Sequence, residues 1–292
     1  MDHTDIIFKF RRFLKLVNYS EETIKNYFHR ITRFSKWVDI PLYQVNSQIV
    51  FEYLGYLHNR NLSPETINSY LNGIKKFYDY LRYEQKLAIV NPVKSSYRQF
   101  VPKPLPRFLK DIEIDILLDY IKNKRDIAMF MLMLRCGLRV SEVANLTFAA
   151  IDWERKRILV LCGKFRKDRV VFMSDDTVLA LMNYIRVRSS LKVRKVFLVQ
   201  KGIFKDNPIS AQGIQKRMKY YAKKTGVKVC CHRLRHTMAT QLLNADAMLS
   251  TVQELMGHEC IISTQRYAKV SNPKVRRDYF RAMKLVVAQE KA

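Results

Sequence analysis

The sequence predicts a mainly helical protein with two domains and one small β-hairpin. Apolar and aromatic residues recur every three or four positions through much of the chain, for example in 24–34 and 74–81, as is typical of helices that bury one face. Two short β-branched runs, 157–161 and 169–173, break this periodicity and favour a pair of strands. A length of 292 residues with 48% hydrophobic content is enough for two packed cores.

The first hundred residues predict a helical domain over 1–90. Its segment Ser-Glu-Glu-Thr-Ile at 20–24 returns as Ser-Pro-Glu-Thr-Ile at 63–67. In both copies the serine can cap a helix, acidic side chains follow in the first turn, and Pro64 occupies a position that needs no N–H donor. The repeated helix start indicates a paired arrangement of two helices.

A proline-containing stretch divides the chain. Residues 91–107 include Pro92, Pro102, Pro104 and Pro106, which stop a helix and stiffen an extended segment. The interpretation is a basic linker over 91–107, followed by a second domain over 108–292.

The second domain is expected to be helical around its hairpin. The hairpin tip carries the basic sequence Cys-Gly-Lys-Phe-Arg-Lys-Asp at 162–168. The expected helices cover 112–121, 126–134, 176–189, 210–224, 232–244, 250–256, 262–268 and 274–288.

The charge of the chain points to a polyanionic partner. The formal net charge is +27, and residues 186–228 contain thirteen basic side chains and one acid, Asp206. Nucleic acid is the expected partner, with a ribosomal or anionic-membrane partner as the alternative. The longest apolar run, 127–134, is shorter than the roughly 20 residues that span a bilayer, and the N-terminus lacks the order of a signal peptide. We therefore expect a cytoplasmic, nucleoid-associated protein without a membrane partner.

Several kinds of site are excluded by the motifs. No glycine-rich phosphate-binding loop occurs, and the five cysteines include no Cys-x-x-Cys pair. His232 and His236 have the spacing of a zinc-binding pair, but Arg233 and Arg235 stand beside them and would repel a metal ion. Neither a metal nor another cofactor is expected.

A set of short motifs in a fixed order carries a more specific signal. In the second domain these are Cys136-Gly-Leu-Arg-Val-Ser-Glu142, Gly163-Lys164, His232-Arg-Leu-Arg235-His236, Gly257-His258 and Tyr267. Taken together they resemble the tyrosine recombinases. The N-terminal motifs Leu62–Ile67, Phe77–Tyr80 and Asn91-Pro92 resemble the core-binding, SAM-like domain of that family, and Leu105–Leu109 resembles the approach to its catalytic domain. The compact layout is similar to the Xer-type members.

The resemblance implies a mixed α/β, mainly helical catalytic domain whose chemistry needs six side chains: Arg139, Lys164, His232, Arg235, His258 and Tyr267. The arginines would meet the charge that develops on a DNA phosphate, and the tyrosine would attack the phosphorus, so that the strand is rejoined without ATP. His232 would accept or orient the tyrosine proton. Lys164 would protonate the leaving 5′-oxygen, and His258 would hydrogen-bond the phosphate.

Supporting roles and departures complete the predicted site. Glu142 would orient Arg139, and His236 would support packing. Tyr279 is the rival nucleophile. The family hairpin commonly reads Gly-Lys-Gly, whereas Phe165 follows the lysine in this chain, and Lys167 is therefore an alternative to Lys164.

The resemblance thus implies a site-specific DNA recombinase that works through a 3′-phosphotyrosyl intermediate and a Holliday junction. Two protomers would bind inverted half-sites, and two such pairs would form a tetramer, either alone or with a partner recombinase. Chromosome-dimer resolution and mobile-element integration or excision both remain open as biological roles. The alternatives are a DNA-relaxing enzyme of the type IB topoisomerase kind and a non-catalytic DNA-binding protein on the same scaffold.

Overall fold

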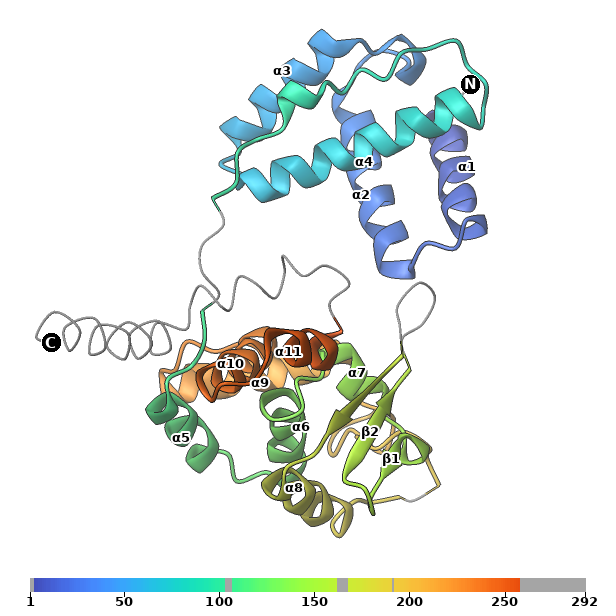
Figure 1. Ribbon diagram of the computed structural model, residues 1–292. Coiled ribbons are helices and arrows are strands. Elements are labelled where there is room, and N and C mark those ends of the chain that lie inside the picture. The colour runs from blue at the N-terminus through green and yellow to red at the C-terminus, as the bar shows by residue number, and fades with distance from the viewer. Residues whose placement is uncertain (1–2, 103–106, 162–167, 191, 258–292) are drawn as a thin grey trace, which may run out of the picture. The chain divides into compact units, whose positions relative to one another are not determined.

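The computed structural model describes residues 3–102, 107–161, 168–190 and 192–257 (Figure 1). The chain divides into two compact units, 1–103 and 104–292, each with its own hydrophobic core. The expected helices at 262–268 and 274–288 lie outside the described residues. Within those residues, no helix is long and apolar enough to cross a membrane.

In the described residues of the N-terminal unit, all regular secondary structure is helical. Its helices are α1 (His3–Leu16), α2 (Glu21–Trp37), α3 (Ser47–Asn59) and α4 (Pro64–Tyr83), with single 3-10 turns at Leu42–Gln44 and Ser95–Tyr97. As the repeated motif predicts, Ser20 Oγ accepts the backbone N–H of Thr23 at 3.2 Å, and Ser63 Oγ accepts that of Thr66 at 3.3 Å. The two helices that start in this way, α2 and α4, pack against each other.

Much of the expected linker is bonded to the N-terminal unit. The Asn91 side-chain amide donates to Asp79 Oδ1 at 2.7 Å, Tyr97 Oη donates to the Ser47 carbonyl at 3.0 Å, and Asn68 exchanges two hydrogen bonds with the backbone of Gln99, both of 2.8 Å. Residues 91–99 therefore lie along this unit.

In the C-terminal unit, other helices and a small sheet surround one buried helix, α6 (Lys124–Leu134). The elements in chain order are α5 (Asp111–Tyr120), α6 (Lys124–Leu134), α7 (Val140–Asn145), β1 (Ile151–Asp152), β2 (Arg157–Val160), β3 (Arg169–Phe172), α8 (Asp175–Ile185), α9 (Ala211–Thr225), α10 (Cys231–Asn244) and α11 (Leu249–Met256). Every residue of 128–134 in α6 is buried, and this helix packs against α7, α8, α9 and α10.

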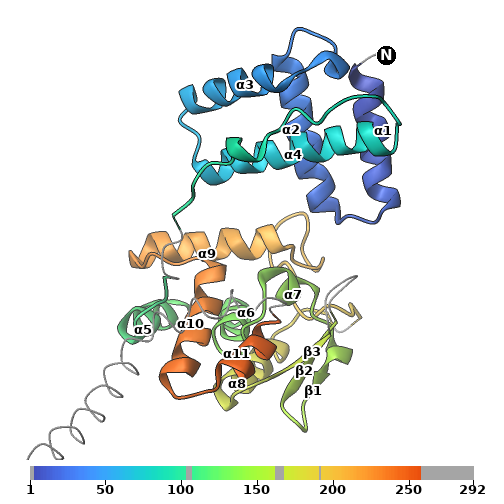
Figure 2. The ribbon, with the colours of Figure 1, turned by 45° about the horizontal axis from the view of Figure 1, so that its top comes forward.

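The sheet confirms the predicted hairpin and adds a strand. It is antiparallel in the order β1-β2-β3, with Ile158 paired to Val171 and Asp152 paired to Arg157. The third strand, β1, was not expected because its two residues carry no alternating pattern. At the edge of the sheet opposite β1, strand β3 packs against α11 (Figure 2). The first residues after the hairpin tip therefore lie next to this helix.

One predicted helix is shorter than expected. The periodicity indicated 176–189, but α8 ends at Ile185. The reason is Arg188, which is buried and whose guanidinium donates to the carbonyl groups of Val193, Lys195 and Val196 at 2.7–2.9 Å. Folding Arg188 onto this loop requires the chain to leave the helix.

A buried carboxylate joins α9 to α6. Asp126 is completely buried, and its carboxylate accepts hydrogen bonds from Arg125, from Arg217 at 2.7 Å and from the Tyr221 hydroxyl at 2.9 Å. Arg125 also donates to the Leu198 carbonyl at 2.9 Å. Each charge in this group has an opposite partner, as burial requires.

Candidate active site

A tight turn before α7 positions Arg139. Gly137 adopts φ of +67°, and a Cβ there would lie 2.0 Å from Met238 Cε, so the Cys-Gly-Leu-Arg segment needs glycine at this point. Arg139 is the residue immediately before α7. Glu142, three residues later, accepts hydrogen bonds from both the Arg139 backbone N–H and its guanidinium, each at 2.7 Å. The predicted pairing of Arg139 with Glu142 is confirmed.

Arg235 reaches the same carboxylate from α10. Its side chain is only 1% exposed, and its guanidinium donates to the carbonyl groups of Gly137 and Met256. Its Nη1 lies 3.9 Å from Glu142 Oε2. The two arginines that the motifs singled out therefore converge, although they are far apart in sequence.

A third arginine, Arg169 at the start of β3, completes the cluster and was missed by sequence reasoning. Its guanidinium binds Glu142 through two parallel hydrogen bonds, of 2.9 and 2.7 Å, and its Nε donates to the Leu255 carbonyl at 2.8 Å. A signal was present, because Arg169 shares the inward face of its strand with Val171. An arginine on a buried face needs a carboxylate partner.

The end of α11 is part of this cluster. The carbonyl groups of Leu255, Met256 and Gly257 all accept hydrogen bonds from the three arginines. Cations are favourable at the carbonyl end of a helix. Gly257 ends the helix with φ of +54°, and a Cβ there would lie 3.0 Å from Arg169 Cδ. The helix that leads into the Gly257-His258 motif is thus attached directly to the arginines.

The electrostatics of the cluster favour an anion. Burial by itself would raise the pKa of Glu142, but the hydrogen bonds from Arg169 and Arg139 and their charges lower this pKa to about 2. Glu142 is therefore a carboxylate at neutral pH, and the three guanidinium groups and one carboxylate sum to a charge of +2. Arg139 keeps 24% of its side chain exposed, so this excess charge can reach a ligand.

His232 stands on α10 one turn before Arg235. Although its side chain reaches solvent, desolvation by the surrounding protein lowers the pKa of His232, and the charges of Arg235 and Arg139 lower it further. The imidazole is therefore neutral at neutral pH and can accept a proton. The half-buried His236 packs edge-on against it, with ring centroids 4.1 Å apart.

The structure thus brings together five of the residues predicted for the site, Arg139, Glu142, His232, Arg235 and His236. The other predicted residues, Lys164, His258 and Tyr267, lie outside the described residues, as do Phe165, Lys167 and Tyr279. In the described ranges, no group of three or more His, Cys, Asp or Glu side chains is arranged to hold a metal ion.

A carboxylate that holds several guanidinium groups beside a neutral histidine has the positive charge and the proton acceptor that phosphoryl-transfer chemistry requires. Residues 107–273 match the phage integrase family, and residues 6–86 match the N-terminal SAM-like domain of phage integrases. The chain belongs to the phage integrase family, and it is a tyrosine recombinase. This confirms the predicted family, the predicted fold class and the enzyme class of site-specific DNA recombinases.

The chain is similar to several Xer recombinases. Tyrosine recombinase XerA of Pyrococcus horikoshii is 32% identical over 176 residues, which span 60% of this chain and 61% of that protein. XerA of Thermococcus kodakarensis is 29% identical over 290 residues, 99% of this chain and 95% of that protein. The fold is shared with the integrase of transposon Tn1549 in complex with transposon right end DNA, with a TM-score of 0.77, 21% identity, and coverage of 97% of this chain and 100% of that one.

Proposed function

We propose that this recombinase cuts and rejoins duplex DNA through a covalent 3′-phosphotyrosyl bond at Tyr267, with the phosphate held beside Glu142. The observation that carries the proposal is the cluster of Arg139, Arg169 and Arg235 on this one carboxylate, which leaves an excess charge of +2. Charge builds on the free oxygens of a phosphodiester as it is attacked, and fixed guanidinium groups stabilise that charge.

The three arginines of the cluster would contribute differently to binding a DNA phosphate. Arg139 is the exposed one and can meet a phosphate oxygen directly. Arg235 is covered, so its guanidinium would exchange the carbonyl of Gly137 or Met256 for a phosphate oxygen when DNA binds. Arg169 is committed to Glu142 through two hydrogen bonds and would hold the carboxylate in place.

The proton transfers would involve residues on either side of the phosphate. A phenol has a pKa near ~10, so the attacking tyrosine must lose its proton to a base. The lowered pKa of His232 keeps its imidazole neutral, so a ring nitrogen is free to accept that proton. Lys164 would protonate the leaving 5′-oxygen, and His258, which follows the arginine-bound end of α11 in sequence, would hydrogen-bond the phosphate.

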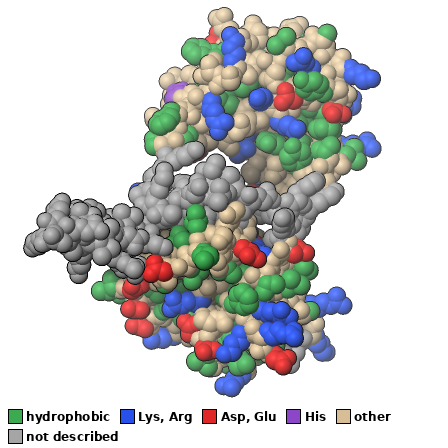
Figure 3. Space-filling view, in the orientation of Figure 1, with side chains coloured by type: hydrophobic (Ala, Val, Ile, Leu, Met, Phe, Trp, Pro, Cys, Tyr) green, Lys and Arg blue, Asp and Glu red, His purple; other side chains and the backbone are tan. Residues whose placement is uncertain are grey.

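The partner would be duplex DNA with inverted half-sites. The net charge of +27 suits phosphate contacts, and basic side chains are spread over the visible surface of both units (Figure 3). A dimer on each site, a tetramer in synapsis and a Holliday junction intermediate complete the proposal, with 274–288 docking on a neighbouring protomer. The protein would act in the cytoplasm on nucleoid DNA, either in chromosome-dimer resolution or in the integration or excision of a mobile element.

The test is covalent trapping. The protein is incubated with nicked suicide duplexes made from its source genome, and covalently bound strands are sequenced. The adduct should disappear in Tyr267→Phe and persist in the matched Tyr279→Phe. An adduct that survives Tyr267→Phe and is lost in Tyr279→Phe would contradict the assignment. Relaxation of any supercoiled plasmid by a monomer, without a preferred site, would favour the topoisomerase alternative.

A further inference from the structure

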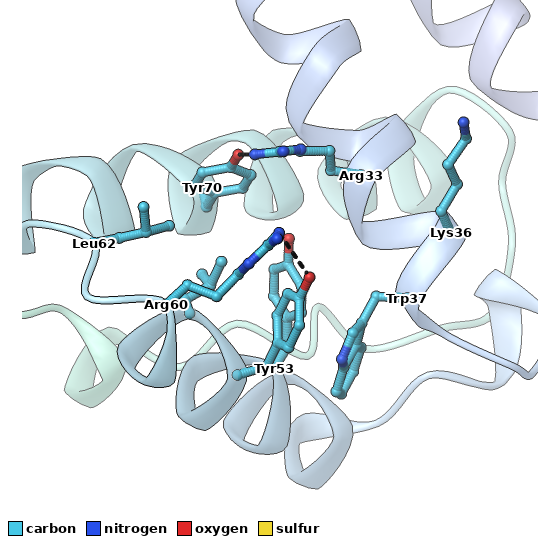
Figure 4. Close-up of a pocket in the computed structure, with 9 residues that line it drawn as sticks. Arg33, Lys36, Trp37, Tyr53, Arg60, Leu62 and Tyr70 are labelled. Atoms are coloured by element: carbon cyan, nitrogen blue, oxygen red, sulfur yellow. Dashed lines mark hydrogen bonds between the residues drawn. The ribbon is translucent and has the colours of Figure 1, made fainter.

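The N-terminal unit contains a pocket of about 430 Å³, far in sequence from the arginine cluster. It lies between the second half of α2, the end of α3 and the first turns of α4 (Figure 4). Its volume is within the ~300–1,000 Å³ range of small-molecule sites. Its walls combine three cations with four aromatic rings, and they contain no acidic side chain; the lining residues are Arg33, Lys36, Trp37, Tyr53, Tyr56, Leu57, Arg60, Leu62 and Tyr70.

The two arginines each donate a hydrogen bond to a tyrosine hydroxyl, which does not neutralise their charge. Arg33 Nη1 donates to the Tyr70 hydroxyl at 3.0 Å, and Arg60 Nη1 donates to the Tyr56 hydroxyl at 2.9 Å. A neutral phenol takes up one of five donors of a guanidinium group and leaves its charge intact. Among the described residues, no carboxylate lies within 4.0 Å of Arg33 or Arg60, unlike the three arginines around Glu142.

Figure 4 shows that Arg33 and Arg60 extend into the same space, whereas Lys36 points away from it. Arg33 extends from α2 toward Tyr70 on one side, Arg60 extends from the end of α3 into the middle, and Lys36 stands at the edge. Guanidinium groups that approach from different elements suit the tetrahedral oxygens of a phosphate better than a planar carboxylate.

The remaining wall is aromatic. Tyr53 stacks on Tyr56 with ring centroids 5.7 Å apart, and Trp37 lies 5.0 Å from Tyr53 and 5.7 Å from Tyr56. Burial raises the pKa of Tyr53, so this phenol also stays neutral. A partly exposed tryptophan beside tyrosines offers a face on which a base can stack.

We infer that this pocket binds one nucleotide, with its phosphate on Arg33 and Arg60 and its base against Trp37. A base in duplex DNA is paired and stacked, so only an unpaired base can lie in a pocket between three helices with its ring against Trp37. The occupant is therefore a free mononucleotide or an unpaired nucleotide of a DNA strand, which share the same chemistry.

The fluorescence of Trp37 provides a direct measure of nucleotide binding to the pocket. The chain has two tryptophans, and in the Trp153→Phe background Trp37 is the sole one. Titration of this full-length protein with deoxyadenosine monophosphate should quench its fluorescence to saturation. Deoxyadenosine alone and inorganic phosphate alone should each bind at least about tenfold more weakly, because each makes half of the contacts.

Matched variants test the residues. Arg33→Gln with Arg60→Gln should weaken binding by about tenfold or more, since charge-assisted hydrogen bonds are lost. Arg12→Gln on α1, an exposed arginine outside the pocket, should leave it unchanged. Tyr56→Phe keeps the ring but releases Arg60, so a loss of a few-fold is expected even if the double variant folds poorly. Circular dichroism establishes the folding of each variant.

The source of the nucleotide is distinguished by competition. A single-stranded oligodeoxyadenosine that displaces the monophosphate would identify a DNA strand as the occupant, and failure to displace it would identify the free nucleotide. No saturable quenching by either probe would overturn the inference, as would quenching that is equal in the double variant and in Arg12→Gln. Quenching by intact duplex alone would overturn it too, by placing the duplex backbone on these arginines.

Discussion

At the scale of single residues, Arg169 matters most for the geometry of the site. It holds Glu142 by two hydrogen bonds, and Glu142 in turn holds Arg139. We expect Arg169→Gln to slow single-turnover cleavage of a suicide duplex by at least about tenfold, with little loss of DNA binding, because Arg139 loses its fixed orientation. It should also destabilise the protein by roughly 3–5 kcal/mol, as breaking a buried ion pair does.

Arg169→Lys separates charge from geometry. Lysine keeps the positive charge but cannot bind Glu142 through two parallel bonds. Stability measured in urea should recover in part, whereas cleavage should stay slow. If a folded Arg169→Gln protein cleaves at the unchanged rate, the arginine has only a structural role.

The titration of Glu142 gives a pH-dependent prediction. Its pKa falls from the ordinary 4.5 to about 2 on folding, so the folded state favours the carboxylate. The stabilisation of about 3 kcal/mol is fully present above about pH 5 and is lost as the pH falls toward 2. The difference in unfolding free energy between the natural protein and Glu142→Gln should therefore shrink below pH 5. A difference that stays constant down to pH 3 would contradict the lowered pKa.

At the scale of elements, the attachment of α9 to α6 depends on one carboxylate. Asp126 is completely buried between Arg125 and Arg217, so Asp126→Asn would leave two cations without a countercharge. We expect a loss of roughly 3–5 kcal/mol in urea unfolding. The matched control is Asp175→Asn, because Asp175 pairs with Lys156 at the surface with 86% of its side chain exposed. That change should cost less than about 1 kcal/mol. Equal effects of the two substitutions would show that burial does not set the strength of the pair.

The helices and strands also show which features the sequence predicts and which it does not. Serine caps and helical periodicity predicted α2 and α4, because these signals lie within one helix. They did not predict β1 or the early end of α8. A two-residue strand exists only through its pairing, and Arg188 is drawn out of the helix by the carbonyl groups of the loop that follows it. In the site, motif order identified Arg139 and Arg235, but the role of Arg169 depends on the packing of β3 against α11.

At the scale of the whole molecule, hydrogen bonds attach the first part of the expected linker to the N-terminal unit, while the two units divide after residue 103, among the prolines. Prolines placed the expected linker at 91–107, yet Asn91, Tyr97 and Gln99 are bonded to α3 and α4. We therefore propose that the independently folding N-terminal piece is 1–102 and that 1–90 is an incomplete domain.

Two fragments test this boundary. The fragment 1–102 should unfold cooperatively in urea, because it contains the whole core of its unit. The fragment 1–90 lacks the bonds of Asn91, Tyr97 and Gln99 and should be less stable by about 3 kcal/mol or more, at roughly 1 kcal/mol for each hydrogen bond. The double substitution Asn68→Ala and Tyr97→Phe in 1–102 should reproduce much of this loss. Equal stability of the two fragments would show that residues 91–99 only rest on the unit, and it would return the boundary to residue 90.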